Sequence, residues 1–191
     1  MRKIGGLRKR WLTNTVSIIC ALGLVCVFVV TMVFSAYYYS GMTSDLKYRA
    51  QSTEAFFDDY LNQNFQVYYQ ACIDYVNGFD EKNHIELQFI DSNGKIIASS
   101  YGTWPGESPT TPDIQDAIVT RQIQTYDDRE PSTGERIIAV SNPVLFSNGQ
   151  VIGVMRYVTS TRLVHQQVLY IALAALGIFA LILAVFIFSS T

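Results

Sequence analysis

Residue types that commonly carry enzyme chemistry are sparse in this chain of 191 residues. The two histidines, His84 and His165, are not accompanied by cysteine or acidic residues at the spacing of a zinc site. The sequence has neither a Walker-type phosphate-binding loop nor the Gly-x-Ser-x-Gly turn of a serine hydrolase. We therefore predict no catalytic residue, no metal site and no cofactor within these residues.

One acidic stretch could contact a cation. Its four carboxylates belong to Asp127, Asp128, Glu130 and Glu135. They could bind a divalent cation or meet a cationic peptide, although the spacing is not that of an EF-hand. A solvated polar connection is the ordinary interpretation of such a stretch, so both interpretations stay open here.

The cysteines indicate a domain without disulfides. Cys20 and Cys26 lie in a long apolar run near the N-terminus, which leaves Cys72 alone in the polar middle of the chain. A single cysteine cannot form an internal disulfide. We expect Cys72 to be a small buried residue on a helix face.

Two Asn-Gly pairs predict the elements that form the middle of the fold. Asn93-Gly94 and Asn148-Gly149 each lie between runs rich in β-branched and aromatic residues. Asn-Gly is a strong hairpin signal, because a type I′ turn needs positive φ at both central residues. We predict two antiparallel hairpins, with strands in residues 86–91, 95–98, 137–146 and 150–155.

Other elements surround these hairpins. Residues 44–77 contain no proline or glycine, and apolar residues recur every three or four positions, which predicts one long helix ending near Asn77. Its aromatic stripe is expected to pack in the core, and to form part of a dimer contact. A loop over residues 99–109, a short helix over 113–119, a strand over 122–126 and a polar connection over 127–134 follow. The predicted fold class is α+β.

Two apolar runs at the ends predict membrane-spanning helices. No Asp, Glu, Lys or Arg occurs between Arg10 and Asp45 or after Arg162, and each gap exceeds the ~20 residues that cross a bilayer. A cleaved signal peptide is the alternative for the first run, but its apolar region is usually shorter, ~7–15 residues. The predicted organisation is a basic cytoplasmic N-terminus (1–11), a first span (12–38), an extracytoplasmic domain (39–162), a second span (163–189) and the start of a cytoplasmic part (190–191).

The charge distribution predicts the orientation of these spans. Five basic residues and no acidic residue precede the first run, whereas residues 45–162 hold nine basic and all sixteen acidic residues. Basic flanks favour the cytoplasmic side. Both termini are therefore expected in the cytoplasm, and the acidic domain outside gives no support for nucleic-acid binding.

The order of these elements resembles the PAS-like extracytoplasmic sensor (PDC or single Cache) of bacterial two-component sensor histidine kinases. Residues 87–100, Leu-Gln-Phe-Ile-Asp-Ser-Asn-Gly-Lys-Ile-Ile-Ala-Ser-Ser, look like the first hairpin of that family. Residues 138–155, with Ser-Asn-Pro at 141–143 and Asn-Gly at 148–149, look like its closing strands. The resemblance implies a PAS-like antiparallel sheet with a long N-terminal helix, flanked by two transmembrane helices.

The same resemblance implies a ligand pocket beneath the connecting loop of the sheet. It would be lined by Tyr101, Trp104, Arg121, Tyr126 and Arg136. An arginine there could pair with a carboxylate in bidentate fashion. The alternative is that Tyr126 belongs to the core and that both arginines are solvated strand residues.

The function implied is that of the sensory and transmembrane part of a signal receptor. A histidine kinase is the expected output, with ATP and Mg²⁺ needed only by a domain beyond Thr191, and with a homodimer and a cognate response regulator as partners. Signals would pass as a piston, tilt or rotation of the two spans. The alternative is a membrane-anchored envelope scaffold without kinase activity.

Overall fold

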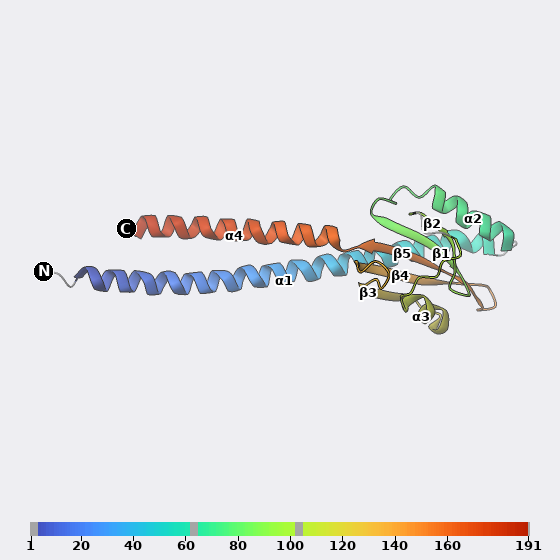
Figure 1. The fold of residues 1–191 in the computed structure, drawn as a ribbon, viewed down its shortest axis with the longest axis horizontal. Coiled ribbons are helices and arrows are strands. Elements are labelled where there is room, and N and C mark those ends of the chain that lie inside the picture. Colours follow the sequence, from blue (N-terminus) through green and yellow to red (C-terminus); the bar gives the residue numbers. More distant parts are fainter. Residues whose placement is uncertain (1–3, 62–64, 102–104, 191) are drawn as a thin grey trace. The chain divides into compact units, whose positions relative to one another are not determined.

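The computed structural model describes residues 4–61, 65–101 and 105–190. Its elements, in chain order, are helices and strands with the following bounds (Figure 1): α1 (Ile4–Leu61), α2 (Phe65–Asn77), β1 (Ile85–Asp91), β2 (Ile96–Ser99), α3 (Asp113–Thr120), β3 (Gln124–Arg129), β4 (Arg136–Leu145), β5 (Val151–Ser160) and α4 (Arg162–Ser190). They divide into two compact units, one made of Met1–Tyr39 with Leu163–Thr191 and the other of Ser40–Arg162.

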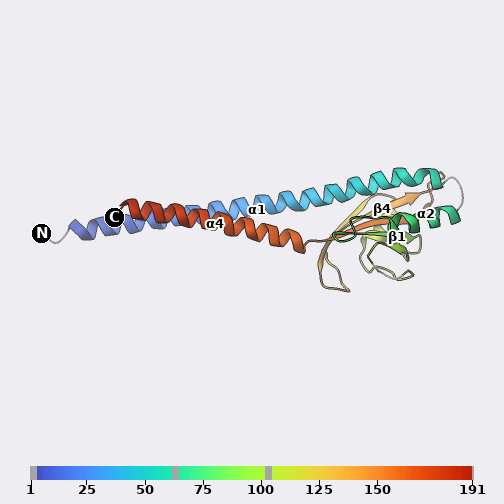
Figure 2. The same cartoon turned by 90° about the horizontal axis from the view of Figure 1, so that it is seen from above.

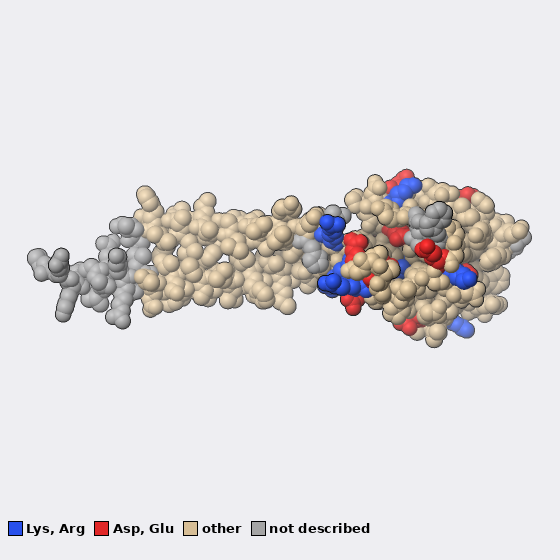
Figure 3. All heavy atoms as spheres, viewed as in Figure 1, with Lys and Arg blue, Asp and Glu red and all other residues tan. Residues whose placement is uncertain are grey.

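The first unit consists of apolar helix. Within Thr13–Phe57 and Gln166–Phe188, windows of high mean hydropathy (2.9 and 3.0) have the length and composition to cross a membrane, and no residue of either window is buried. Among the residues drawn in colour in Figure 3, Lys, Arg, Asp and Glu gather on the other unit. In this apolar unit Gly23 of α1 lies directly against the ring of Phe179 on α4, so a side chain at position 23 would overlap that ring.

The second unit is built on a five-stranded sheet with the order β2-β1-β5-β4-β3, in which all neighbours are antiparallel. The hairpins β1–β2 and β4–β5 form at Asn93-Gly94 and Asn148-Gly149, as predicted. The α+β class and the PAS-like sheet with a long N-terminal helix are thus confirmed.

The turns of these hairpins differ from the predicted type I′. Gly94 and Gly149 have φ of 81° and 78°, but among the described residues Arg121 is the only non-glycine with positive φ. The amide of Gly94 donates to the Asp91 carbonyl (3.0 Å), and the Asp91 carboxylate accepts from the amides of Asn93 and Lys95 (2.8 Å each). This side-chain acceptor holds a longer turn in which glycine alone takes the left-handed position.

The two faces of the sheet carry different side chains, because successive residues of a strand point to opposite sides. One face presents Phe89, Met155 and Asn142 in one row and Leu87, Tyr157 and Val140 in the next. The opposite face presents Ile90 with Val154, then Gln88 with Arg156 and Ser141. The first face packs against α1 and α2, and the second packs against α3.

Contacts from α1 define the first face. The Thr53 hydroxyl lies 2.7 Å from the Tyr157 hydroxyl, both buried, and the Phe57 and Phe89 rings meet edge to face at 5.1 Å. Asn142 donates from Nδ2 to Glu54 (2.6 Å). The last part of α1 therefore belongs to the core of the second unit.

The predicted continuous helix over residues 44–77 is wrong in one respect. The structure has two helices there, and α2 returns beside α1 (Figure 2). The Phe56 and Tyr75 rings lie 5.4 Å apart, whereas nineteen residues of one straight helix would separate them by ~28 Å. The return lets aromatic residues from both helices cover one face of the sheet, and α2 ends at Asn77 as expected.

Strand β3 also extends further than predicted. It begins at Gln124 and includes Asp127, Asp128 and Arg129, which pair with Ile138, Ile137 and Arg136 of β4. The acidic stretch is thus divided between an edge strand and the β3–β4 turn. Pairing along β4 outweighs the low strand propensity of aspartate.

Candidate functional site

A polar row crosses the second face of the sheet. Gln88 of β1 and Ser141 of β4 are both register partners of Arg156 in the central strand β5. Apolar clusters lie on each side, one with Ile90, Ile96, Ile114, Ala117 and Val154 and one with Ile137, Ala139 and Val158. A buried polar row between apolar clusters must satisfy its hydrogen bonds internally.

Arg156 makes those bonds with three side chains. Its Nε donates to Asp113 Oδ2 at the start of α3 (2.9 Å), its Nη1 to Gln88 Oε1 (3.1 Å), and its Nη2 to Thr111 Oγ1 (2.7 Å). Ser141 Oγ donates to the same Asp113 oxygen (2.6 Å). The guanidinium is therefore occupied by groups of the chain itself.

Burial and charge act in opposite directions on Asp113. Burial alone would raise its pKa, but the Arg156 charge and the hydrogen bonds to its carboxylate outweigh burial and hold the pKa below its ordinary value. Asp113 Oδ2 accepts two bonds, while Oδ1 is buried without a protein partner among the described residues. The pair anchors the loop before α3 to the sheet. Among the residues whose burial the structure describes, it leaves no free buried Lys or Arg for a carboxylate ligand.

A cavity of about 600 Å³ lies on the same face, beneath the loop after β2 and the β3–β4 turn. Gln88, Ile96, Ile137 and Val158 contribute its floor side chains. The loop is held over the edge of β2 by backbone bonds between Ile96 and residues Gly106 and Glu107 (2.8 Å each). The volume of this cavity and its mixed polar and apolar lining suit a small-molecule site.

The charged lining of the cavity is mostly acidic. Four glutamates contribute, Glu86, Glu107, Glu130 and Glu135, against one lysine, Lys82, and one histidine, His84. Glu86 Oε1 accepts from Ser99 Oγ (2.6 Å) and Gln88 Nε2 (2.8 Å). In the part of the chain that the structure describes, no lysine or arginine forms an ion pair with Glu130 or Glu135.

The residues predicted as a ligand set lie in different places. Tyr101 lines the cavity. Arg121 ends α3 in the left-handed conformation (φ 57°) and is exposed, and Arg136 pairs with Asp127 (3.2 Å). Tyr126 packs on the Ile137 cluster, and its hydroxyl donates to the Arg129 carbonyl (2.7 Å). Trp104 lies outside the described residues.

The predicted acidic set is also divided. Glu130 and Glu135 line the cavity, whereas Asp127 and Asp128 lie on β3 away from it. Asp128 Oδ1 accepts from the amide of Arg129 (2.7 Å). Among the described residues no three His, Cys, Asp or Glu side chains are placed to hold a metal ion.

Arg156, Asp113, Gln88, Thr111 and Ser141 were not predicted as site residues. One signal in the sequence could have indicated Arg156: a lone arginine within the apolar run Val154-Met155-Arg156-Tyr157-Val158. A charge on a buried strand needs a buried partner. The partner Asp113 lies 43 residues away, so local patterns do not identify it.

Comparison with known proteins identifies the domain. Residues 73–159 match the Cache_WalK family, described as "WalK sensor protein kinase Chache domain". The sequence matches none of the curated proteins compared with it.

Three solved structures share the fold. One is the sensor domain of the histidine kinase DctB of V. cholerae, with TM-score 0.52 and 18% identity over 70% of this chain and 54% of that one. Another is the ligand-binding domain of the C. jejuni chemoreceptor Tlp3 in complex with L-valine. The TM-score is 0.52, with 11% identity over 86% of this chain and 66% of that one. The third is the ligand-binding domain of Mlp24 with asparagine. The TM-score is 0.52, with 19% identity over 76% of this chain and 60% of that one.

This chain therefore spans about half to two thirds of those domains. The family match covers β1 to β5 except for the last residue of β5. The unit Ser40–Arg162 has a PAS-like fold, and its residues 73–159 match a family of Cache sensor domains.

Proposed function

We propose that this chain is the sensory and transmembrane part of a bacterial signal receptor, with a histidine kinase as its output. Support comes from the family match, whose description names a sensor protein kinase, and from the likeness in fold to the sensor domain of DctB. The receptor is proposed to act as a homodimer that passes its signal to a response regulator.

The two apolar helices are proposed to cross the plasma membrane. Their length and composition support this, and the five basic residues before the first helix favour a cytoplasmic N-terminus. The sensor domain then lies outside the cell, and α4 follows β5 after one residue. A rearrangement at the end of β5 can therefore reach the second span directly.

We further propose that the signal is a small organic cation. The observation behind this proposal is the lining of the cavity, with four glutamates against one lysine. A cleft lined by charges of one sign concentrates ligands of the other sign. Arg156, the buried cation next to the floor, is already bound by Asp113 and is therefore not free to pair with a carboxylate ligand.

The chemistry of the cavity suits ammonium or guanidinium groups better than metal ions. Glu130 and Glu135 lie at its rim, and apolar residues of the sheet form part of its floor. Such a site suits a ligand with cationic ends and an alkyl middle.

Calorimetry on the full chain in detergent would test this function, with spermidine as a cationic probe and succinate as an anionic one. Spermidine is expected to bind, and binding should weaken as salt screens the carboxylates. The double variant Glu130→Gln/Glu135→Gln should lose most of this affinity. The matched control Asp116→Asn/Asp128→Asn removes two charges that lie away from the cavity and should keep it. Tight succinate binding without spermidine binding would contradict the proposed ligand class.

A further inference from the structure

Ser160 connects a carboxylate of the cavity to the first residue of α4. Its hydroxyl donates to Glu135 Oε1 (2.5 Å) and accepts from the amide of Arg162 (3.1 Å). Glu135 and Ser160 both line the cavity, and Arg162 begins the helix that continues as the second apolar span. Two hydrogen bonds therefore link a wall of the cavity to the start of that helix.

The amide of Arg162 depends on this link. The first amides of a helix have no acceptor within the helix and need one from outside it. A serine hydroxyl has one proton to donate, so the bond to Glu135 fixes that proton and leaves the oxygen free to accept. Because linked hydrogen bonds polarise one another, a charged acceptor on one side strengthens Ser160 as an acceptor on the other.

The chain path beside this link is held separately. Thr161 donates from its amide and from its hydroxyl to the Arg136 carbonyl (3.0 and 3.1 Å). Ile137 and Ser160 are register partners in the sheet. Loss of the Ser160 hydroxyl should thus release the first turn of α4 without detaching β5.

We propose that Ser160 is a positioning residue that transmits occupation of the cavity to α4. A cation bound by Glu135 withdraws negative charge from the bond to Ser160, which weakens Ser160 as the acceptor for Arg162 and loosens the first turn of the helix. This inference rests on the proposed ligand class for its trigger, but the link itself exists without any ligand.

Hydrogen exchange with residue-level fragmentation tests the link on the full chain in lipid nanodiscs, without ligand. Ser160→Ala and Glu135→Ala should each speed exchange of the Arg162 amide, by about five-fold for loss of a cap. Ser160→Thr keeps a hydroxyl and should restore the slow rate. Ser132→Ala removes an exposed hydroxyl from the same turn region and serves as the matched control. Unchanged exchange at Arg162 in Ser160→Ala would overturn the proposal.

Spermidine tests the trigger in the same preparation. Spermidine should speed exchange of the Arg162 amide in the wild type. It should bind Ser160→Ala with the wild-type affinity, but the exchange rate of the Arg162 amide in that variant should stay the same with and without spermidine. Binding to the wild type without any change at Arg162 would overturn the role of Ser160 and leave the proposed ligand class intact. If spermidine does not bind, the ligand class fails, and the ligand-free variants decide whether Ser160 holds the helix start.

Discussion

Arg156 and Asp113 form an ion pair inside the sensor domain, with Nε and Oδ2 2.9 Å apart and side chains 1% and 0% exposed. Both charges have left water, and the hydroxyl groups of Ser141 and Thr111 and the amide of Gln88 give the pair further hydrogen bonds that offset this cost. The pair joins β5 to the start of α3 and holds the loop above the cavity.

Removing one partner of this pair should destabilise the domain strongly. Arg156→Met leaves a buried carboxylate without its cation, which typically costs about 3–5 kcal/mol. The double variant Asp113→Asn/Arg156→Met removes both charges and should lose less than Arg156→Met alone. Chemical unfolding of the full chain in detergent, followed by circular dichroism, measures both.

Arg121→Met is the matched control, because this arginine is exposed at the end of α3. It should change the free energy of unfolding by less than about 0.5 kcal/mol. A loss as large as that of Arg156→Met would mean that the ion pair is not what stabilises the fold.

Stability should fall in acid through Asp113. Its folded pKa lies below the ordinary value, which is about 3.9 in an unfolded chain. The ionised form therefore stabilises the fold above that unfolded pKa, and this contribution disappears as the pH falls through the lower folded pKa. Melting temperatures between pH 7 and pH 2 should decline less steeply for Asp113→Asn than for the wild type. If the melting temperatures of Asp113→Asn and the wild type fell in parallel with pH, the acid sensitivity would belong to other carboxylates.

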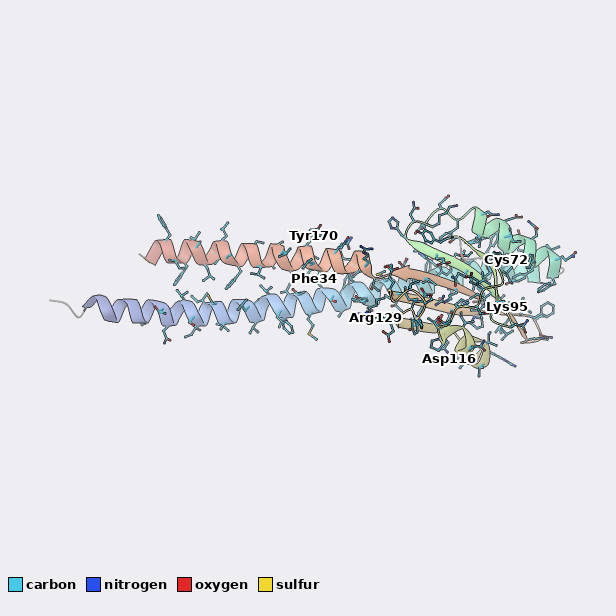
Figure 4. All side chains as sticks on the ribbon, viewed as in Figure 1. Phe34, Cys72, Lys95, Asp116, Arg129 and Tyr170 are labelled. Atoms are coloured by element: carbon cyan, nitrogen blue, oxygen red, sulfur yellow. The ribbon has the colours of Figure 1, made fainter. Side chains whose placement is uncertain are left out.

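Cys72 should resist alkylation in the folded protein. Its side chain is buried on α2 (Figure 4), and burial raises the pKa of its thiol to about 12. The thiolate is the reactive form, so only about one part in 10⁴ is reactive at pH 8. Iodoacetamide labelling followed by mass spectrometry should modify Cys72 only after denaturant is added. Rapid labelling in buffer would show that α2 opens readily.

Gly153 should tolerate no side chain. A Cβ at this position would contact the carbonyl oxygen of Ile90, in the neighbouring strand β1. Gly153→Ala must push two paired strands apart, and we expect a loss of about 1–3 kcal/mol. Gly41→Ala is the control, because nothing lies within 4 Å of its Cβ position in α1, and alanine favours a helix by about 0.5–1 kcal/mol. Equal melting temperatures for the two variants would contradict the close approach.

Gly23→Leu should disturb the packing of α1 against α4 in the apolar unit. The added side chain would overlap the Phe179 ring, whereas nothing lies within 4 Å of the Cβ position of Gly177. In lipid the hydrophobic effect does not drive helices together, so their association depends on close packing at small residues. Melting of the full chain in lipid nanodiscs should therefore drop for Gly23→Leu and stay near wild type for Gly177→Leu. A larger drop in melting temperature for Gly177→Leu than for Gly23→Leu would exclude the contact between Gly23 and Phe179.

The sequence by itself determined the features that depend on neighbouring residues. Turn residues at Asn93-Gly94 and Asn148-Gly149 specify both hairpins, because the backbone conformation there excludes most other residues. The apolar runs indicate the two long apolar helices, because hydropathy needs no tertiary partner to be recognised. The α+β class follows from these local signals.

Only the tertiary structure decided which distant residues meet. The helical pattern of residues 44–77 continues past the point where α2 turns back, because helices before and after a reversal have the same periodicity. The partner of Arg156 depends on the register of three strands and on the position of α3. The same holds for the cavity: the pairing of the buried Arg156 with Asp113, and the position of Glu130 and Glu135 along one cavity, are properties of the folded sheet.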